Sequence, residues 1–153
     1  KALVSIEEFC EKIAAACEAK ASEDFLLVAR TDARGVTDYD DAVRRAHAYL
    51  EAGADAIFPE ALHTEEELRR FADDVDTILL ANMTEFGKTP YLGVEQFGEL
   101  GYNIVIFPVT LQRAAMKAMD EVLSAIREMG SQEDALQNMQ TREELYDLLK
   151  YRP

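Results

Sequence analysis

The stretch Phe25-Leu26-Leu27-Val28-Ala29, followed by Arg30-Thr31-Asp32, decides the fold. An uninterrupted apolar run of this length predicts a strand that is buried on both faces, which is typical of a parallel sheet. A polar loop over 30–38 follows, and then a helix with apolar residues at helical spacing that stops at Gly53. The stretch therefore predicts a strand–loop–helix unit.

The same unit recurs along the chain. Further apolar runs predict strands at 56–58, 78–81 and 104–107. Each is followed by a predicted helix, the first capped by Thr64, the second short and centred on Phe97, and the third long, over 111–129. The repeat of roughly 22 to 30 residues is the spacing of βα units in a parallel sheet.

Two architectures use such units, the doubly wound sheet and the (β/α)8 barrel. No GxGxxG or GxxxxGK motif follows the first strand, which weakens the nucleotide-binding version of the doubly wound sheet. A complete barrel needs eight units and typically about 250 residues. With four units in 153 residues, the chain is predicted to be a single α/β domain over 1–153 that forms half of a TIM barrel, with trailing helices.

The ends of the chain carry helix signals. Ser5 and Glu8 form a capping box at the start of a helix that contains Cys10 and Cys17. Seven residues on a helix span about 10 Å, too far for a disulfide, so both cysteines are expected to be buried apolar fillers. The acidic run that includes Asp38 and Asp41 is interpreted as a helix N-terminus that complements the macrodipole. Two more capped helices are predicted in the tail, from about residues 131 and 141.

Composition limits the possible partners. The chain has 16 Lys and Arg against 30 Asp and Glu, a formal net charge of −14, which argues against binding to nucleic acid or to an anionic membrane surface. No apolar run approaches the ~20 residues of a membrane span, and no signal peptide is recognisable at the start. We expect a cytoplasmic protein.

Polar residues follow the predicted strands where active sites of parallel α/β proteins lie. Arg30 follows the first strand, Glu60 the second, and Asn82 with Thr84 the third. The Arg30 fork suits a carboxylate, Asn82 and Thr84 suit a second anion, and Glu60 suits proton transfer or the positioning of a hydroxyl. The alternative is that Arg30 and Glu60 form only a structural ion pair. The two histidines show no ligand spacing, so a histidine-based metal site is not expected.

These strand ends resemble the methylisocitrate lyases of the isocitrate lyase and phosphoenolpyruvate mutase superfamily. The motifs that carry the resemblance are VARTDA (28–33), EAGADAIFPEA (51–61), LANMTEFGKTP (80–90), VIFPVT (105–110) and MQTREELYDLL (139–149). The resemblance covers the chain from Lys1 to about Tyr151. RTDA is shared across the superfamily, whereas NMTEFGKTP with the MQTREELY tail is more specific to the methylisocitrate branch.

The resemblance implies roles for these residues. Arg30 matches the arginine that binds the carboxylate of the pyruvate-like half of the substrate, and Glu60 matches a catalytic glutamate near the reacting centre. The succinate half is matched by Asn82 and Thr84, with Thr110 beside them and Arg113 a weaker match. Such enzymes cleave a C–C bond of 2-methylisocitrate by a retro-aldol step that yields pyruvate and succinate, and Mg²⁺ stabilises the developing charge. They assemble as homo-oligomers, tetramers in the family.

The chain also departs from the family pattern. The carboxylates that hold Mg²⁺ and a KKCGH-like catalytic loop would precede Lys1, and neither Cys10 nor Cys17 fits that loop. We therefore expect the C-terminal half of a lyase barrel, inactive when isolated, with no metal ligand of its own. The alternatives are a superfamily member acting on oxaloacetate, phosphonopyruvate or isocitrate, or a non-catalytic half-barrel that assembles with a partner half.

Overall fold

The computed structural model describes residues 1–152. The chain divides into two compact units, the first over Lys1–Val109 and the second from Thr110 onward. The expectation of one domain over 1–153 stays a prediction.

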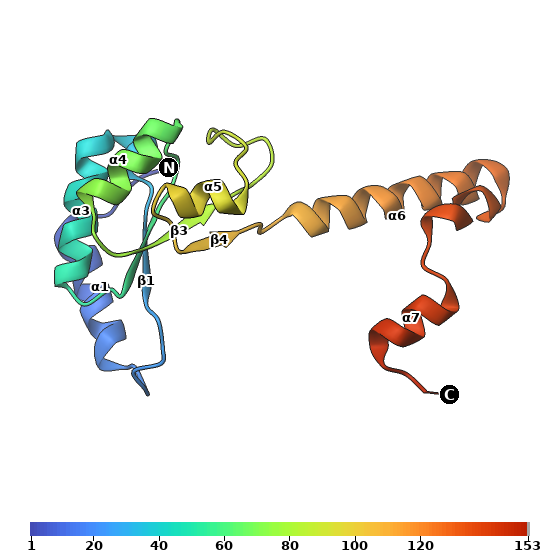
Figure 1. Cartoon of the computed structure of the whole chain (residues 1–153), viewed down its shortest axis with the longest axis horizontal. Coiled ribbons are helices and arrows are strands. Elements are labelled where there is room, and N and C mark those ends of the chain that lie inside the picture. The colour runs from blue at the N-terminus through green and yellow to red at the C-terminus, as the bar shows by residue number, and fades with distance from the viewer. Residues whose placement is uncertain (153) are drawn as a thin grey trace. The chain divides into compact units, whose positions relative to one another are not determined.

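The first unit is built on a parallel sheet of four strands in the order β1-β2-β3-β4 (Figure 1). The strands are β1 Val28–Thr31, β2 Ala56–Pro59, β3 Ile78–Asn82 and β4 Ile104–Ile106. Each strand pairs in parallel with the next along the chain, with Arg30 opposite Phe58 and Ala81 opposite Val105. Since parallel neighbours need a crossover, a helical segment lies between successive strands, and the predicted parallel α/β architecture is confirmed.

The longer helices of the first unit, those that begin at Ile6, Tyr39 and Glu65, start at a side-chain cap, whereas the short helices that begin at Ala33 and Val94 do not. The helices are α1 Ile6–Glu18, α2 Ala33–Val36, α3 Tyr39–Glu51, α4 Glu65–Asp74 and α5 Val94–Glu99. Ser5 Oγ accepts a hydrogen bond from the Glu8 amide at 3.1 Å, and Thr64 caps α4 in the same way. The reciprocal half of the Ser5 box is not made by Glu8, whose carboxylate accepts from Lys12 Nζ at 2.6 Å instead.

The first strand lies further along the chain than its apolar run predicts. Phe25 and Leu26 are 59% and 43% exposed, and the strand extends from Val28 to Thr31. The turn before β2 sets this start, because the Leu27 amide donates to Asp55 Oδ2 at 2.7 Å and the Leu27 carbonyl accepts from the Asp55 amide at 2.9 Å. A strand is present as expected, but its predicted bounds of 25–29 were wrong, because β1 covers Val28–Thr31. The short helix α2, within the expected loop, was also not predicted.

The core of the first unit contains apolar residues from the strands and from helices α1, α3, α4 and α5. Phe71 and Phe97 are completely buried, and each makes an edge-on ring contact with a tyrosine, Tyr39 at 6.2 Å and Tyr102 at 5.8 Å. This core fixes the strands whose carboxyl ends carry the predicted site.

Both cysteines pack against this core, but they are half-buried rather than buried as expected. Each thiol lies near a carbonyl of the end of α3 or the turn after it: Cys10 Sγ is 3.5 Å from Ala48 O, and Cys17 Sγ is 2.9 Å from Gly53 O. Both thiols are free. They join α1 to the C-terminal end of α3.

The second unit consists of α6 Thr110–Met129, the 3₁₀ helix η1 Glu133–Asn138 and α7 Arg142–Leu149. The Thr141 capping box with Glu144 starts α7, as its sequence predicts. The helix expected from about residue 131 is a 3₁₀ helix. None of the helices described in residues 1–152 has the length and apolar character needed to cross a membrane.

Candidate functional site

Three predicted site residues come together at the carboxyl edge of the sheet. Arg30 lies on β1, Asn82 ends β3, and Glu60 directly follows β2. The Glu60 amide donates to the Thr31 carbonyl at 2.9 Å, which continues the β1–β2 pairing one residue beyond the ladder. Because the strands are parallel, their ends deliver these side chains to the same edge.

These side chains form a connected chain of polar contacts. Arg30 Nη2 lies 3.1 Å from Glu60 Oε2, and Asn82 Nδ2 donates to the same oxygen at 3.4 Å. Arg30 also donates from Nε and Nη2 to Asp32, at 2.9 and 3.1 Å. Its guanidinium carbon lies 4.8 Å from the centre of the Phe58 ring. The ion pair between Arg30 and Glu60 that the sequence left as an alternative is therefore present.

The cluster is charged and partly open to solvent. The Arg30 side chain is 43% exposed, and its hydrogen bond with Asp32 raises the guanidinium pKa against the opposing effect of burial. The hydrogen bond from Arg30, followed by that from Lys1, lowers the pKa of the Asp32 carboxyl. Asp32 is thus a carboxylate held between two cations.

A cavity of about 490 Å³ opens over this edge of the sheet. It is lined by Lys1, Asp32, Gly35, Val36, Glu60, Ala61, Asn82, Thr84, Gly87, Lys88 and Thr89. The structure thus brings the predicted Glu60, Asn82 and Thr84 into one cavity, and Arg30 contacts two of its lining residues. The volume is in the usual range for a small-molecule site, about 300–1,000 Å³.

Asn82, a residue of the cavity lining, has a polar atom whose partner is not supplied by the described protein. Asn82 Oδ1 is buried and accepts no hydrogen bond from residues 1–152. Buried acceptors in folded proteins are nearly always satisfied by protein, water or ligand. Asn82 Oδ1 is thus an acceptor near Glu60 that the described protein leaves without a donor.

Sequence reasoning missed part of the cavity wall. The loop after β3 contributes Gly87, Lys88 and Thr89, although only the first residues of its motif were assigned a role. Ala61, next to Glu60, has a φ of 63°, a left-handed conformation that costs a residue with a Cβ about 1–2 kcal/mol. Such strain is common at functional sites, but the sequence pattern at Ala61 gave no signal of it.

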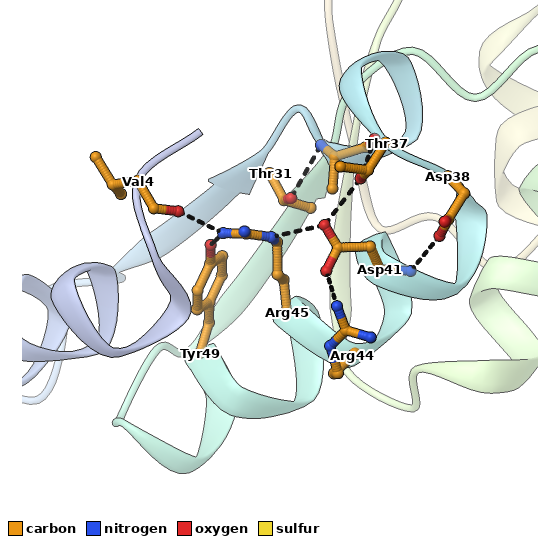
Figure 2. A network of polar contacts seen from close by, with 9 residues as sticks. Val4, Thr31, Thr37, Asp38, Asp41, Arg44, Arg45 and Tyr49 are labelled. Atoms are coloured by element: carbon orange, nitrogen blue, oxygen red, sulfur yellow. Dashed lines mark hydrogen bonds and ion pairs between the residues drawn. The ribbon is translucent and has the colours of Figure 1, made fainter. Parts of the chain in front are cut away.

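A second polar cluster lies on α3 (Figure 2). The side chains of Asp41 and Arg45 are only 7% and 10% exposed, and Arg45 Nε donates to Asp41 Oδ2 at 3.0 Å. Arg45 Nη1 also donates to the Tyr49 hydroxyl at 3.2 Å and to the Val4 carbonyl at 3.0 Å. Asp41 further pairs with Arg44. Every charged group of the cluster thus has a partner, which is the condition for burying charge.

This buried network supports two parts of the cavity wall. Through Val4 it holds the segment that leads back to Lys1, and Lys1 lines the cavity and pairs with Asp32. Thr37 Oγ1 lies 2.8 Å from Asp41 Oδ2 and 2.9 Å from the Ala33 carbonyl, so the network also reaches α2, whose residues line the cavity (Figure 2). Asp41, interpreted from its sequence context as a dipole-complementing residue, is a structural anchor.

The charge state of Asp41 follows from its partners. Burial acts to raise the pKa of this carboxyl, but hydrogen bonds from Thr37 and Arg45 and the nearby positive charges outweigh burial and lower the pKa. Asp41 is therefore ionised in the folded protein.

The remaining predicted site residues belong to the second unit. Thr110 begins α6 and Arg113 lies in its first turn. Their roles stay predictions. Among residues 1–152, no group of three or more histidine, cysteine, aspartate or glutamate side chains could hold a metal ion. Asp32 and Glu60 do not form such a group, and both are paired with Arg30.

Comparison with known proteins identifies the family. Residues 1–127 match the phosphoenolpyruvate phosphomutase family. The chain belongs to this family. Over 151 residues, 99% of its length, it is 58% identical to a 2-methylisocitrate lyase of Aeropyrum pernix and 52% identical to one of Bacillus subtilis. It covers 48% and 50% of those two proteins, so it spans about half the length of these relatives.

Solved structures of this superfamily share the fold. A 2,3-dimethylmalate lyase matches with a TM-score of 0.86 at 31% identity, over 95% of this chain and 52% of that one. A phosphonopyruvate hydrolase solved with oxalate and Mg²⁺ matches with a TM-score of 0.83 at 35% identity, over 97% of this chain and 53% of the other. The predicted fold, part of a (β/α)8 barrel, and the predicted kinship with methylisocitrate lyases are both confirmed.

Proposed function

We propose that this chain supplies the substrate-binding edge of a carbon–carbon lyase that cleaves 2-methylisocitrate to pyruvate and succinate. The observation that carries the proposal is the cavity in which Glu60, Asn82 and Thr84 meet, with Arg30 bonded to its rim. Identity of 40–58% to 2-methylisocitrate lyases supports the choice of substrate. Because the chain spans about half of those enzymes, the whole reaction is part of the proposal.

Arg30 is proposed to bind a substrate carboxylate. Its guanidinium already holds two carboxylates in place, those of Asp32 and Glu60. A ligand carboxylate that enters beside them competes for the same planar fork, whose donors match carboxylate geometry in two parallel bonds. The ion pair of Arg30 with Glu60 and a binding role for Arg30 are therefore compatible.

Glu60 is proposed to accept the substrate's hydroxyl proton. Its Oε2 forms an ion pair with Arg30 and accepts a hydrogen bond from Asn82, whereas Oε1 has no donor among residues 1–152. In the retro-aldol step, the hydroxyl proton passes to a base, and the oxygen becomes the ketone oxygen of pyruvate. The electrons of the broken C–C bond pass to the succinate-forming fragment, which then takes up a proton from an acid.

Mg²⁺ enters this proposal only through the family resemblance and the solved phosphonopyruvate hydrolase. The described residues of this chain do not form a site that fits it, so no step is assigned to the ion. The location in the cytoplasm, the homo-oligomeric assembly and the roles of Thr110 and Arg113 likewise remain parts of the proposal.

A titration tests the binding half of the proposal. The ¹⁵N-labelled chain is titrated with pyruvate, oxalate and succinate while its amide NMR signals are recorded. We expect the amides of Glu60, Asn82 and Thr84 to shift together and to saturate, and the shifts to weaken in Arg30→Lys. Shifts that are confined to surfaces outside the cavity, or none up to the solubility limit, would contradict the proposal.

A chimaera tests the reaction itself. This chain is joined to the part of the Bacillus subtilis 2-methylisocitrate lyase that it does not match, and the product is assayed with 2-methylisocitrate. We expect release of pyruvate and succinate, abolished by Glu60→Gln. A folded chimaera that instead forms oxalate from oxaloacetate would assign the chain to the activity of the oxaloacetate acetylhydrolases, whose solved structures it also matches.

A further inference from the structure

Lysine side chains line the cavity at two positions, and their surroundings differ. Lys1 is bonded to Asp32 and so is already neutralised. Lys88 lines the same cavity, yet among residues 1–152 it has no ion-pair partner. Lys88 is therefore an unpaired cation in the cavity lining of a chain whose formal net charge is −14.

The backbone on both sides of Lys88 is held in place. Before it, the Phe86 amide donates to the Tyr91 hydroxyl at 2.9 Å. After it, Thr89 Oγ1 donates to the Leu62 carbonyl at 2.8 Å, which ties the loop to the segment after β2. Gly87 leaves little room, since a Cβ there would lie 3.3 Å from Thr84 Cγ2. These contacts hold the backbone on both sides of Lys88, which is exposed and lines the cavity together with Thr84.

The charges of the cavity show what Lys88 can recognise. The lining lysines, Lys1 and Lys88, are balanced in number by Asp32 and Glu60, and Arg30 adds a positive charge beside them. Arg30 serves one carboxylate of a ligand under the proposed function. A second carboxylate of the same ligand would be held more strongly if a cation that the protein has not already paired lay beside the neutral donors Asn82 and Thr84. Lys88 is such a cation.

We propose that Lys88 binds the second carboxylate of a dicarboxylate ligand and thereby sets the preference of this cavity for dicarboxylates over monocarboxylates. This inference rests on the proposed function, because it assumes that the cavity binds carboxylates. Lys88 contributes a point charge on a flexible stem, whereas Arg30 contributes a planar fork. Lys88 is a specificity-determining residue and takes no part in the proton transfer assigned to Glu60.

The test compares Lys88→Gln with the unaltered chain in the same NMR titration, with succinate as the dicarboxylate and pyruvate as the monocarboxylate. Loss of one partly exposed charge contact should weaken succinate binding about three- to tenfold. Pyruvate binding should stay unchanged. The difference in succinate affinity between the unaltered chain and Lys88→Gln should become smaller at high salt, because an exposed charge contact is screened. A purely structural role for Lys88 would produce no such selectivity or salt dependence.

Matched variants complete the test. Lys88→Arg keeps the charge and should retain succinate binding. Lys12→Gln removes a lysine of α1 that is paired with Glu8 outside the cavity lining, and it should change the binding of neither ligand. If the unaltered chain binds both ligands at Asn82 and Thr84, and Lys88→Gln binds succinate as tightly as the unaltered chain does, the inference about Lys88 is wrong while the proposed function stands. If the unaltered chain binds neither ligand there, both the proposed function and the inference about Lys88 are wrong.

Discussion

The two arginine–aspartate clusters of the first unit use the same chemistry at different depths. Arg30 bonds to Asp32 at the rim of the cavity and is 43% exposed, whereas Arg45 bonds to Asp41 beneath the wall and is 10% exposed. A charge pair in water contributes about 0–1 kcal/mol to folding, while breaking a buried pair by removing one partner costs about 3–5 kcal/mol. The exposed pair of Arg30 and Asp32 is therefore available to a ligand, whereas the buried pair of Arg45 and Asp41 stabilises the fold.

The largest effect is expected from Arg45→Met. This change leaves Asp41 with less compensation and removes the bonds to Val4 and Tyr49. The free energy of unfolding, measured by urea denaturation, should fall by about 3 kcal/mol. The matched control is Arg44→Met, because Arg44 also pairs with Asp41 but is 66% exposed, and it should cost less than about 1 kcal/mol. Equal losses in the two variants would contradict the role of depth.

Arg30→Lys is expected to weaken ligand binding strongly and to change the stability of the fold little. Lysine keeps the charge but loses the planar fork, so binding of pyruvate or oxalate should weaken by about 1.5–3 kcal/mol, on the order of 10- to 100-fold. Stability should change little, since the side chain is partly exposed. Titration and a melting curve on the same sample provide both measurements. A large fall in melting temperature with unchanged binding would make the Arg30–Glu60 pair purely structural.

The buried cluster should make the stability of the protein depend on pH in the acid range, through the ionisation of Asp41. Its folded pKa lies below the ordinary value, so between the folded pKa and the unfolded value near 3.9 the unfolded chain binds more protons. The stability that Asp41 contributes is therefore present above about pH 4 and is lost as the pH falls through its folded pKa. Unfolding free energy measured from pH 6 downward should fall less steeply in Asp41→Asn than in the unaltered chain. Parallel profiles would show that Asp41 does not contribute to the acid dependence.

The smallest effect on stability is expected from Glu60→Gln. Arg30 keeps its two hydrogen bonds to Asp32, so the unfolding free energy should change by less than about 1 kcal/mol. The change removes the proposed proton acceptor, so the chimaera should lose activity while its melting temperature is retained. A loss of stability as large as that of Arg45→Met would place Glu60 with the buried cluster instead.

Local patterns predicted much of the site because its residues directly follow strands. An apolar run indicates a strand, and parallel pairing then brings the ends of successive strands to one edge, so Glu60, Asn82 and Thr84 could be grouped from their positions along the chain. Lys1 and Lys88 could not be grouped in this way. Lys1 lies before the first repeating unit, and Lys88 lies well along the loop between β3 and α5. Hydrogen bonds from Arg45 to Val4 and from Thr89 to Leu62 hold the segments on which these lysines lie.

The sequence alone determined the strand–helix alternation, the helix caps at Ser5 and Thr64, and the family, because these depend on residues close together along the chain. Tertiary structure decided the start of β1, since Asp55 binds the Leu27 backbone across a gap of 28 residues. Tertiary structure also decided that Asp41 and Arg45 form a buried ion pair. Their spacing of four residues on a helix is visible in the sequence, but burial depends on what packs over that helix, and burial determines how strongly paired charges interact.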